Sequence, residues 1–154
     1  LHFEVDNGEF YIKDVLEQVR EYYQDKMQLN QIVFDMGQYR NCLVYGDKDR
    51  LVEVLQNIIE NAIKYGDGKR IWLDMQREAE EYIIRISNTG CQLEDKELPH
   101  IFDSFFRGSN IDKKPGSGLG LYICRQLMHL MEGEITAAVT AKDEDCIMMV
   151  HQNC

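Results

Sequence analysis

Three stretches of the chain repeat apolar residues at helical spacing. The first predicts an amphipathic helix at about Tyr11–Met27, and the second predicts one at about Lys48–Tyr65 with Asp47 as its N-cap. A third helix is predicted at Gly118–Met131, with Gly133 as its C-terminal stop. Each predicted helix has one apolar face, which it should bury against a neighbouring layer.

Short runs rich in β-branched and aromatic residues predict strands around these helices. The predicted strands are Leu1–Asp6 as a possible edge strand, Gln31–Asp35, Asn41–Tyr45, Arg70–Gln76, Glu81–Ser87, Glu134–Val139 and Cys146–Val150. The charged residues Arg77–Glu80 predict a hairpin turn, and Trp72 in mid-strand is expected in the core. The mixture of hairpins and alternating elements predicts an α+β sandwich, a mixed sheet with helices on one face. The segment Asn88–Ser117 contains both prolines and is predicted to be a long loop, which is usually a functional feature.

Composition narrows the function classes. The chain has 154 residues, the length of one domain, and its 17 Lys and Arg against 27 Asp and Glu give a net charge of −10. So acidic a domain is a poor partner for nucleic acid or an anionic membrane surface. No apolar run approaches the roughly 18 residues of a membrane span. Because the first residue is not Met, we expect the chain to be a piece of a longer protein.

The five cysteines show no metal-site spacing. No two of them form a CxxC pair, and their number is odd. We therefore expect reduced thiols in a cytosolic domain. The cysteines are Cys42, Cys91, Cys124, Cys146 and Cys154.

Polar residues fill one narrow sector of the predicted helix Lys48–Tyr65. At 100° per residue, Asn57, Asn61 and Lys64 share a face opposite the apolar one. The apolar face consists of Leu51, Leu55, Ile58, Ile59 and Ala62. An amide oxygen is a ligand suited to Mg²⁺, and Lys supplies a positive charge, so this face could hold a metal–phosphate group. The alternative is an ordinary solvated surface.

Two glycine-containing turns add further candidate chemistry. The segment Gly116–Leu121 leads into a helix, where free N–H groups and close backbone approach suit a phosphate. The alternative is a tight hinge. At the end of a strand, Ser87–Gly90 offers Asn88, whose amide can hydrogen-bond a base edge. The alternative there is an ordinary turn.

In this order and spacing, the motifs resemble the catalytic ATP-binding domain (HATPase_c) of bacterial sensor histidine kinases, within the gyrase–Hsp90–kinase–MutL (GHKL) superfamily. The resemblance covers the whole chain, residues 1–154. The matching motifs are the N box at Leu55–Tyr65, the G1 box at Ser87–Gly90, the F box at Leu98–Arg107 and the G2 box at Gly116–Leu121. The resemblance implies a Bergerat-type two-layer α/β sandwich with a mostly antiparallel mixed sheet. It also implies a mobile ATP lid at about residues 103–117, with its base pinned by Phe102, Phe105 and Phe106.

The resemblance implies ATP and Mg²⁺ as cofactors. Asn61 would bind Mg²⁺ through its side-chain oxygen, while Asn57 and Lys64 would act at the phosphates as the catalytic pair. Arg107 would reach the phosphates as well. The residues implied to line the phosphate side are Gly116, Gly118, Leu119, Gly120 and Leu121.

At the adenine end, the resemblance implies that Asn88 faces the adenine amino group. Gly90 would let the base approach, and Tyr65 would pack near the adenine or ribose. The family usually has Asp where this chain has Asn88, and Gln92 replaces a second glycine. The amide still offers an acceptor, so adenine recognition is expected to survive with an affinity that could be lower.

Position 57 separates the possible functions. GHKL ATPases and anti-sigma serine kinases carry Glu one turn before the metal-binding Asn, where it activates water or a hydroxyl. This chain has Asn57, and Glu60 points about 60° away from the Asn face. A histidine acceptor needs less help, because neutral imidazole has a free lone pair. We therefore expect an ATP:protein-histidine phosphotransferase, with the serine kinase, the ATPase and a non-catalytic nucleotide-binding module as alternatives.

The resemblance also implies partners. These are the protein's own dimerisation helices with the phosphoacceptor histidine, which are absent from this chain, and a response regulator receiver domain. The full-length protein is expected to be a homodimer anchored in the inner membrane, with this domain in the cytoplasm and without nucleic acid as a partner. Alone, the domain is expected to bind ATP with little turnover.

Overall fold

The computed structural model describes residues 4–104, 120–140 and 145–154, with the side chain of Asp95 left out. Its helices are α1 (Ile12–Leu29), α2 (Lys48–Tyr65), the 3₁₀ helix η1 (Asp95–His100) and α3 (Gly120–Leu130). Its strands are β1 (Gly8–Tyr11), β2 (Val33–Met36), β3 (Leu43–Gly46), β4 (Arg70–Glu78), β5 (Glu81–Thr89), β6 (Glu134–Val139) and β7 (Asp145–Asn153). None of the described helices has the length and apolar character needed to cross a membrane.

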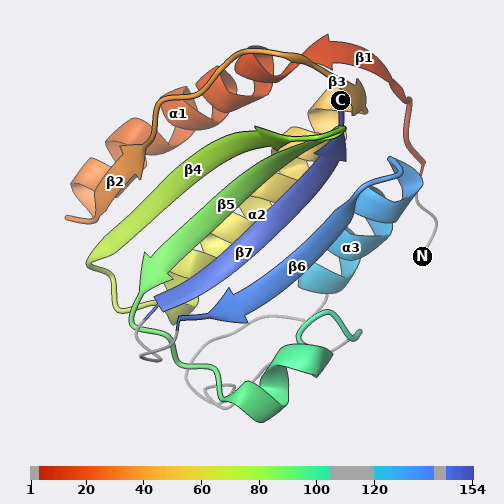
Figure 1. Ribbon diagram of the computed structural model, residues 1–154. Helices are drawn as coiled ribbons and strands as arrows, with labels where there is room; N and C mark the ends of the chain where they lie inside the picture. The colour runs from red at the N-terminus through yellow and green to blue at the C-terminus, as the bar shows by residue number, and fades with distance from the viewer. Residues whose placement is uncertain (1–3, 105–119, 141–144) are drawn as a thin grey trace.

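The five-stranded sheet has the order β2–β4–β5–β7–β6. Only β2 and β4 run parallel, and the other neighbours are antiparallel. Strands β1 and β3 form a separate antiparallel pair. In Figure 1, α2 runs behind β4, β5 and β7, flanked by α1 and α3. This arrangement confirms the predicted α+β sandwich with a mixed, mostly antiparallel sheet.

Helix α2 has the bounds that the sequence predicts. Its apolar face is buried in one cluster with residues of the sheet, such as Leu73 and Ile84. At its start, the Asp47 carboxylate accepts a hydrogen bond from the Arg50 N–H at 3.2 Å, as expected of an N-cap. Burial of the apolar face fixes the rotation of the helix, so Asn57 and Asn61 cannot turn into the core.

Two sequence predictions about the sheet are wrong. No strand is present at residues 4–6; the first strand is β1, because Gly8–Tyr11 is the segment that pairs with β3. Trp72 is only partly buried, outside the core, with the Arg70 guanidinium 4.4 Å from its ring centroid. It lies on the opposite side of β4 from the buried Leu73, as the period of two requires.

A disulfide joins Cys91, just after β5, to Cys146 near the start of β7. The two Cα atoms are 5.1 Å apart, although 55 residues separate them in sequence. The β5–β7 register places Cys146 opposite Asn88, and Gly90 turns the chain with a φ of +75°. The prediction of reduced thiols is therefore wrong for this pair. The free cysteines are Cys42, Cys124 and Cys154.

Candidate nucleotide site

The polar face of α2 lies beside the start of α3. Gly120 is the first described residue of α3, and a Cβ added to it would lie 3.9 Å from Asn61 Nδ2. One turn earlier on α2, Asn57 lies next to the buried thiol of Cys124 on α3, whose Sγ donates a hydrogen bond to the Val54 carbonyl of α2 at 3.8 Å. Burial raises the pKa of that thiol to about 12, against a smaller lowering by Asn57, so it stays neutral at physiological pH. The packing of α3 on α2 thus brings together two segments that are far apart in sequence.

The start of α3 and the α2 face have the chemistry to hold an anion with its metal. The first turn of a helix presents N–H groups without intrahelical partners and the positive end of the helix dipole. Lys64, on the same face of α2, is exposed and has no ion-pair partner within the described part of the chain. Amide oxygens suit Mg²⁺, so the donor set fits a metal–phosphate group. Leu121 packs with its partly buried side chain against the core.

Asn88 lies at the C-terminal end of α2. It is 9% exposed, and its Nδ2 donates a hydrogen bond to the Thr89 carbonyl at 3.0 Å. That hydrogen bond occupies the amide nitrogen of Asn88. The amide oxygen, Oδ1, accepts no hydrogen bond from the described residues. Gly66, which follows the partly buried Tyr65, packs so closely that an added Cβ would lie 2.7 Å from Asn88 Nδ2. The end of α2 and the end of β5 therefore meet at Asn88.

Asp67 organises the turn after Asn88, a role that the sequence analysis missed. Its Oδ1 accepts hydrogen bonds from Thr89 Oγ1 at 2.6 Å and from the Lys69 N–H at 2.9 Å. The pKa of the Asp67 carboxyl lies below its usual value. Burial alone would raise this pKa, but the hydrogen bonds from Thr89 and Lys69 outweigh burial. Gly90 is needed there, because an added Cβ would lie 2.4 Å from the Asp67 Cβ. The sequence Asp67-Gly68 signals a turn, but not its pairing with Thr89.

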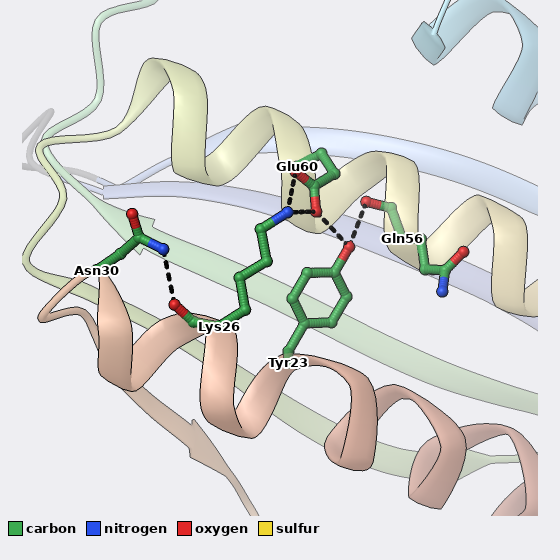
Figure 2. Close-up of polar contacts among 5 residues, drawn as sticks. All are labelled: Tyr23, Lys26, Asn30, Gln56 and Glu60. Atoms are coloured by element: carbon green, nitrogen blue, oxygen red, sulfur yellow. Dashed lines mark hydrogen bonds and ion pairs between the residues drawn. The ribbon is translucent and has the colours of Figure 1, made fainter.

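The Glu60 side chain of α2 points toward α1 (Figure 2). Its carboxylate accepts a hydrogen bond from the Tyr23 hydroxyl at 2.7 Å and bonds from Lys26 Nζ at 2.9 and 3.0 Å. The Tyr23 hydroxyl also lies 3.3 Å from the Gln56 carbonyl. Burial, followed by the bond to Glu60, raises the pKa of Tyr23, so the hydroxyl stays a donor. The prediction that Glu60 lies off the Asn face is confirmed.

Part of the predicted site lies outside the described residues. This part comprises Arg107, Gly116, Gly118, Leu119, the two phenylalanines Phe105 and Phe106, and all of the lid at about 103–117 except Asp103 and Ser104. Before it, Ile101 and Phe102 are buried, and the Arg125 guanidinium lies 5.3 Å from the Phe102 ring centroid. Phe102 thus anchors the chain next to α3, as expected. The described residues hold no cluster of His, Cys, Asp or Glu that could bind a metal.

Comparison with protein families gives a match to histidine kinase-, DNA gyrase B- and HSP90-like ATPases over residues 46–151. The sensor protein TorS of Escherichia coli is 31% identical over 108 residues, which are 70% of this chain and 12% of TorS. The sensor histidine kinase RcsC of Escherichia coli is 38% identical over 93 residues, which are 59% of this chain and 10% of RcsC. The chain thus spans only about a tenth of the length of these relatives.

The same fold occurs in solved structures of histidine kinases. A mycobacterial sensor histidine kinase, MprB, superimposes with a TM-score of 0.82 at 21% identity, covering 95% of this chain and 97% of that one. Full-length ShkA, solved in complex with AMPPNP, gives a TM-score of 0.81 at 19% identity over 99% of this chain and 32% of ShkA. The kinase ThkA, solved with the response regulator TrrA, gives 0.77 at 21% identity over 97% of this chain and 42% of that one.

Proposed function

Because the chain belongs to the family of histidine kinase-, DNA gyrase B- and HSP90-like ATPases, we propose that it is the ATP-binding catalytic domain of a two-component sensor histidine kinase. In this role it transfers the γ-phosphoryl group of ATP to a histidine on a separate dimerisation domain. We choose histidine as the acceptor because both glutamates of α2 are bound to other side chains.

Both glutamates of α2 are engaged elsewhere. Glu60 is held by two side chains of α1, and Glu53 accepts an ion-paired hydrogen bond from Arg50 Nη1 at 2.8 Å. On the site face, position 57 is an amide that cannot take up a proton. Hydrolysis and transfer to serine need a base to deprotonate the nucleophile, whereas neutral imidazole already offers a lone pair. These features support histidine as the acceptor.

The adenine end of the proposed site is formed by Asn88, Gly90 and Tyr65. Asn88 Oδ1, free of other partners among the described residues, accepts from the adenine amino group. Gly90 lets the base approach where a side chain would collide with Asp67. Tyr65 packs beside the adenine or ribose.

The phosphate end is formed by α2 and α3. Asn57 and Lys64 bind and orient the phosphates. The backbone N–H groups of Gly120 and Leu121 donate hydrogen bonds to the phosphate oxygens. Asn61 would hold Mg²⁺ through its side-chain oxygen, and the bound ion would neutralise charge on the phosphates. The same proposal includes four residues outside the described ranges, Arg107, Gly116, Gly118 and Leu119.

The proposed partners follow from the relatives. ThkA was solved with a response regulator and ShkA with an ATP analogue, and we extend both kinds of partner to this chain. The proposal adds a phosphoacceptor domain that makes the full-length protein a homodimer. It places this domain in the cytoplasm and the full-length protein in the inner membrane.

The test is transfer from ATP radiolabelled at the γ-phosphate to the histidine of the protein's own dimerisation helices, joined to this chain. We expect an acid-labile, base-stable phosphoprotein that forms only with Mg²⁺. Asn61→Ala should lower the rate of transfer at least about 100-fold, because the metal loses its protein ligand.

Asn30→Ala is the matched control, since it truncates an exposed asparagine that bonds only its own helix, at the Lys26 carbonyl. It should leave the rate unchanged. An acid-stable phosphoprotein, or equal losses in the two variants, would contradict the proposal.

A further inference from the structure

The Cys91–Cys146 disulfide borders the adenine end of the proposed site. Cys91 directly follows Gly90, and Cys146 pairs with Asn88 across the β5–β7 ladder. Both cysteines are only partly buried, so a small thiol reagent can reach them. The turn at Gly90 is thus held on one side by Asp67 and on the other by a covalent bond.

A disulfide in an ATP-binding domain has a chemical implication. ATP is used in the cytosol, where thiols are kept reduced and the disulfides that form are typically transient, catalytic or redox-sensing. A redox role therefore suits this disulfide better than a permanent structural role. Its position next to Asn88 connects its formation to nucleotide recognition.

We propose that Cys91 and Cys146 are a redox-modification site that controls nucleotide affinity, with dithiols and small disulfides as its reactants. This inference rests on the proposed function. The disulfide keeps the Asn88–Gly90 turn in the arrangement that receives adenine. Reduction removes the covalent link between Cys91 and β7, while Asn88 and Thr89 stay paired with β7 in the ladder. The chain after Thr89 gains freedom, nucleotide binding has to order it again, and that ordering lowers the affinity.

The exchange chemistry is balanced. One thiolate of a dithiol attacks one sulfur of the Cys91–Cys146 bond, forms a mixed disulfide and releases the other cysteine as a thiol after protonation. The second thiol of the reagent then displaces the first cysteine. Two electrons and two protons reach the cysteines, and the dithiol becomes a cyclic disulfide. The reverse step uses a small disulfide such as oxidised glutathione, which leaves as two thiols.

The first measurement counts thiols in the denatured chain by alkylation and mass spectrometry. The count uses the Cys42→Ser/Cys154→Ser variant, because those two thiols lie in contact and can be paired by the same oxidant. We expect one alkylated cysteine, Cys124, after treatment with oxidised glutathione and three after dithiothreitol. Isothermal titration calorimetry with ADP and Mg²⁺ then compares the two states. We expect at least about fivefold weaker binding in the reduced chain, the lower end of typical coupling between two sites.

Two variants control for the other cysteines. Cys91→Ser should bind ADP as weakly as the reduced chain and should ignore dithiothreitol. The double variant Cys42→Ser/Cys154→Ser removes two free thiols that lie within hydrogen-bonding contact of each other, and it should keep the full redox response.

The outcomes separate the two proposals. Three alkylated thiols in the oxidised double variant, equal affinities in the two states, or a response lost in the double variant would each overturn the redox site alone. Absence of ADP binding in both states would overturn the proposed function, and the redox inference with it. The wild-type comparison needs no substitution, so a poorly folded Cys91→Ser does not affect it.

Discussion

Gly66 leaves room for the Asn88 side chain at the point where α2 ends. A Cβ on this residue would lie 2.6 Å from the Ala62 carbonyl oxygen and 2.7 Å from Asn88 Nδ2. Backbone on one side and a site residue on the other leave little freedom for relaxation. The position of Asn88, and with it the proposed adenine contact, therefore depends on the absence of a side chain at Gly66.

We expect Gly66→Ala to weaken ADP binding about tenfold, because the added methyl group displaces the Asn88 amide and one hydrogen bond to the base is lost. Overpacking against Ala62 should also lower the free energy of unfolding by about 1–3 kcal/mol. Calorimetry and urea denaturation measure the two effects. Gly8→Ala is the control, because nothing lies within 4 Å of its added Cβ. Unchanged affinity in Gly66→Ala would show that Asn88 does not contact the nucleotide.

Between elements, α1 and α2 are joined by the polar contacts of Tyr23 and Lys26 with Glu60. Tyr23 is fully buried, and its hydroxyl donates a hydrogen bond to the Glu60 carboxylate at 2.7 Å. This contact occupies the Glu60 carboxylate on the side of α2 away from Asn57 and Asn61. The contact thus joins the two helices and occupies a carboxylate that could otherwise act as a base in the proposed site.

We expect Tyr23→Phe to lower the free energy of unfolding by about 0.5–1.5 kcal/mol, the usual contribution of one hydrogen bond, with ADP affinity unchanged. Tyr22→Phe on the exposed neighbour is the matched control and should change stability by less than about 0.5 kcal/mol. Urea denaturation monitored by circular dichroism compares the two. Equal stabilities for the two variants would mean that the Glu60 contact contributes nothing to the packing of α1 on α2.

The sequence predicts elements well where the signal is local. The bounds of α2 are correct because both the 3.6-residue repeat and the Asp47 cap lie within one segment. The hairpin after β4 is tighter than predicted, since Ala79 adopts a φ of +52° and the strands run on to Glu78 and Glu81. Helix η1 was missed because its capping box uses Glu94 in place of Ser or Thr.

Contacts between segments that are far apart in the chain could not be predicted from the sequence at the candidate site. The polar face of α2 and the start of α3 could be predicted as site components, but only packing brings Gly120 next to Asn61. The contact of Asp67 with Thr89 and the bond between Cys91 and Cys146 depend on strand register. Register is decided by the whole sheet, so no short motif carries it.

At the scale of the whole molecule, the proposed site combines candidate nucleotide ligands with two glutamates of α2 that are bound to other side chains. We expect the chain alone to bind ATP but to release phosphate about 10²- to 10⁴-fold more slowly than a base-assisted hydrolase. Asn57→Glu should raise phosphate release by supplying a carboxylate on the site face, while Asn57→Gln, of equal length but without a basic oxygen, should not. Phosphate release under saturating ATP and Mg²⁺ is the measurement. Turnover of about one per second by the unmodified chain would instead indicate an ATPase.

The disulfide also changes how the backbone is connected. Because it joins Cys91 to Cys146, the intervening chain, with η1, α3 and β6, is a closed covalent ring attached to the rest of the domain at one point. A ring spanning 55 residues restricts the unfolded chain, a restriction worth about 4 kcal/mol in the chain-entropy view. A single proteolytic cut within the ring leaves one molecule of unchanged connectivity to both termini. Only reduction turns such a nick into two separate polypeptides.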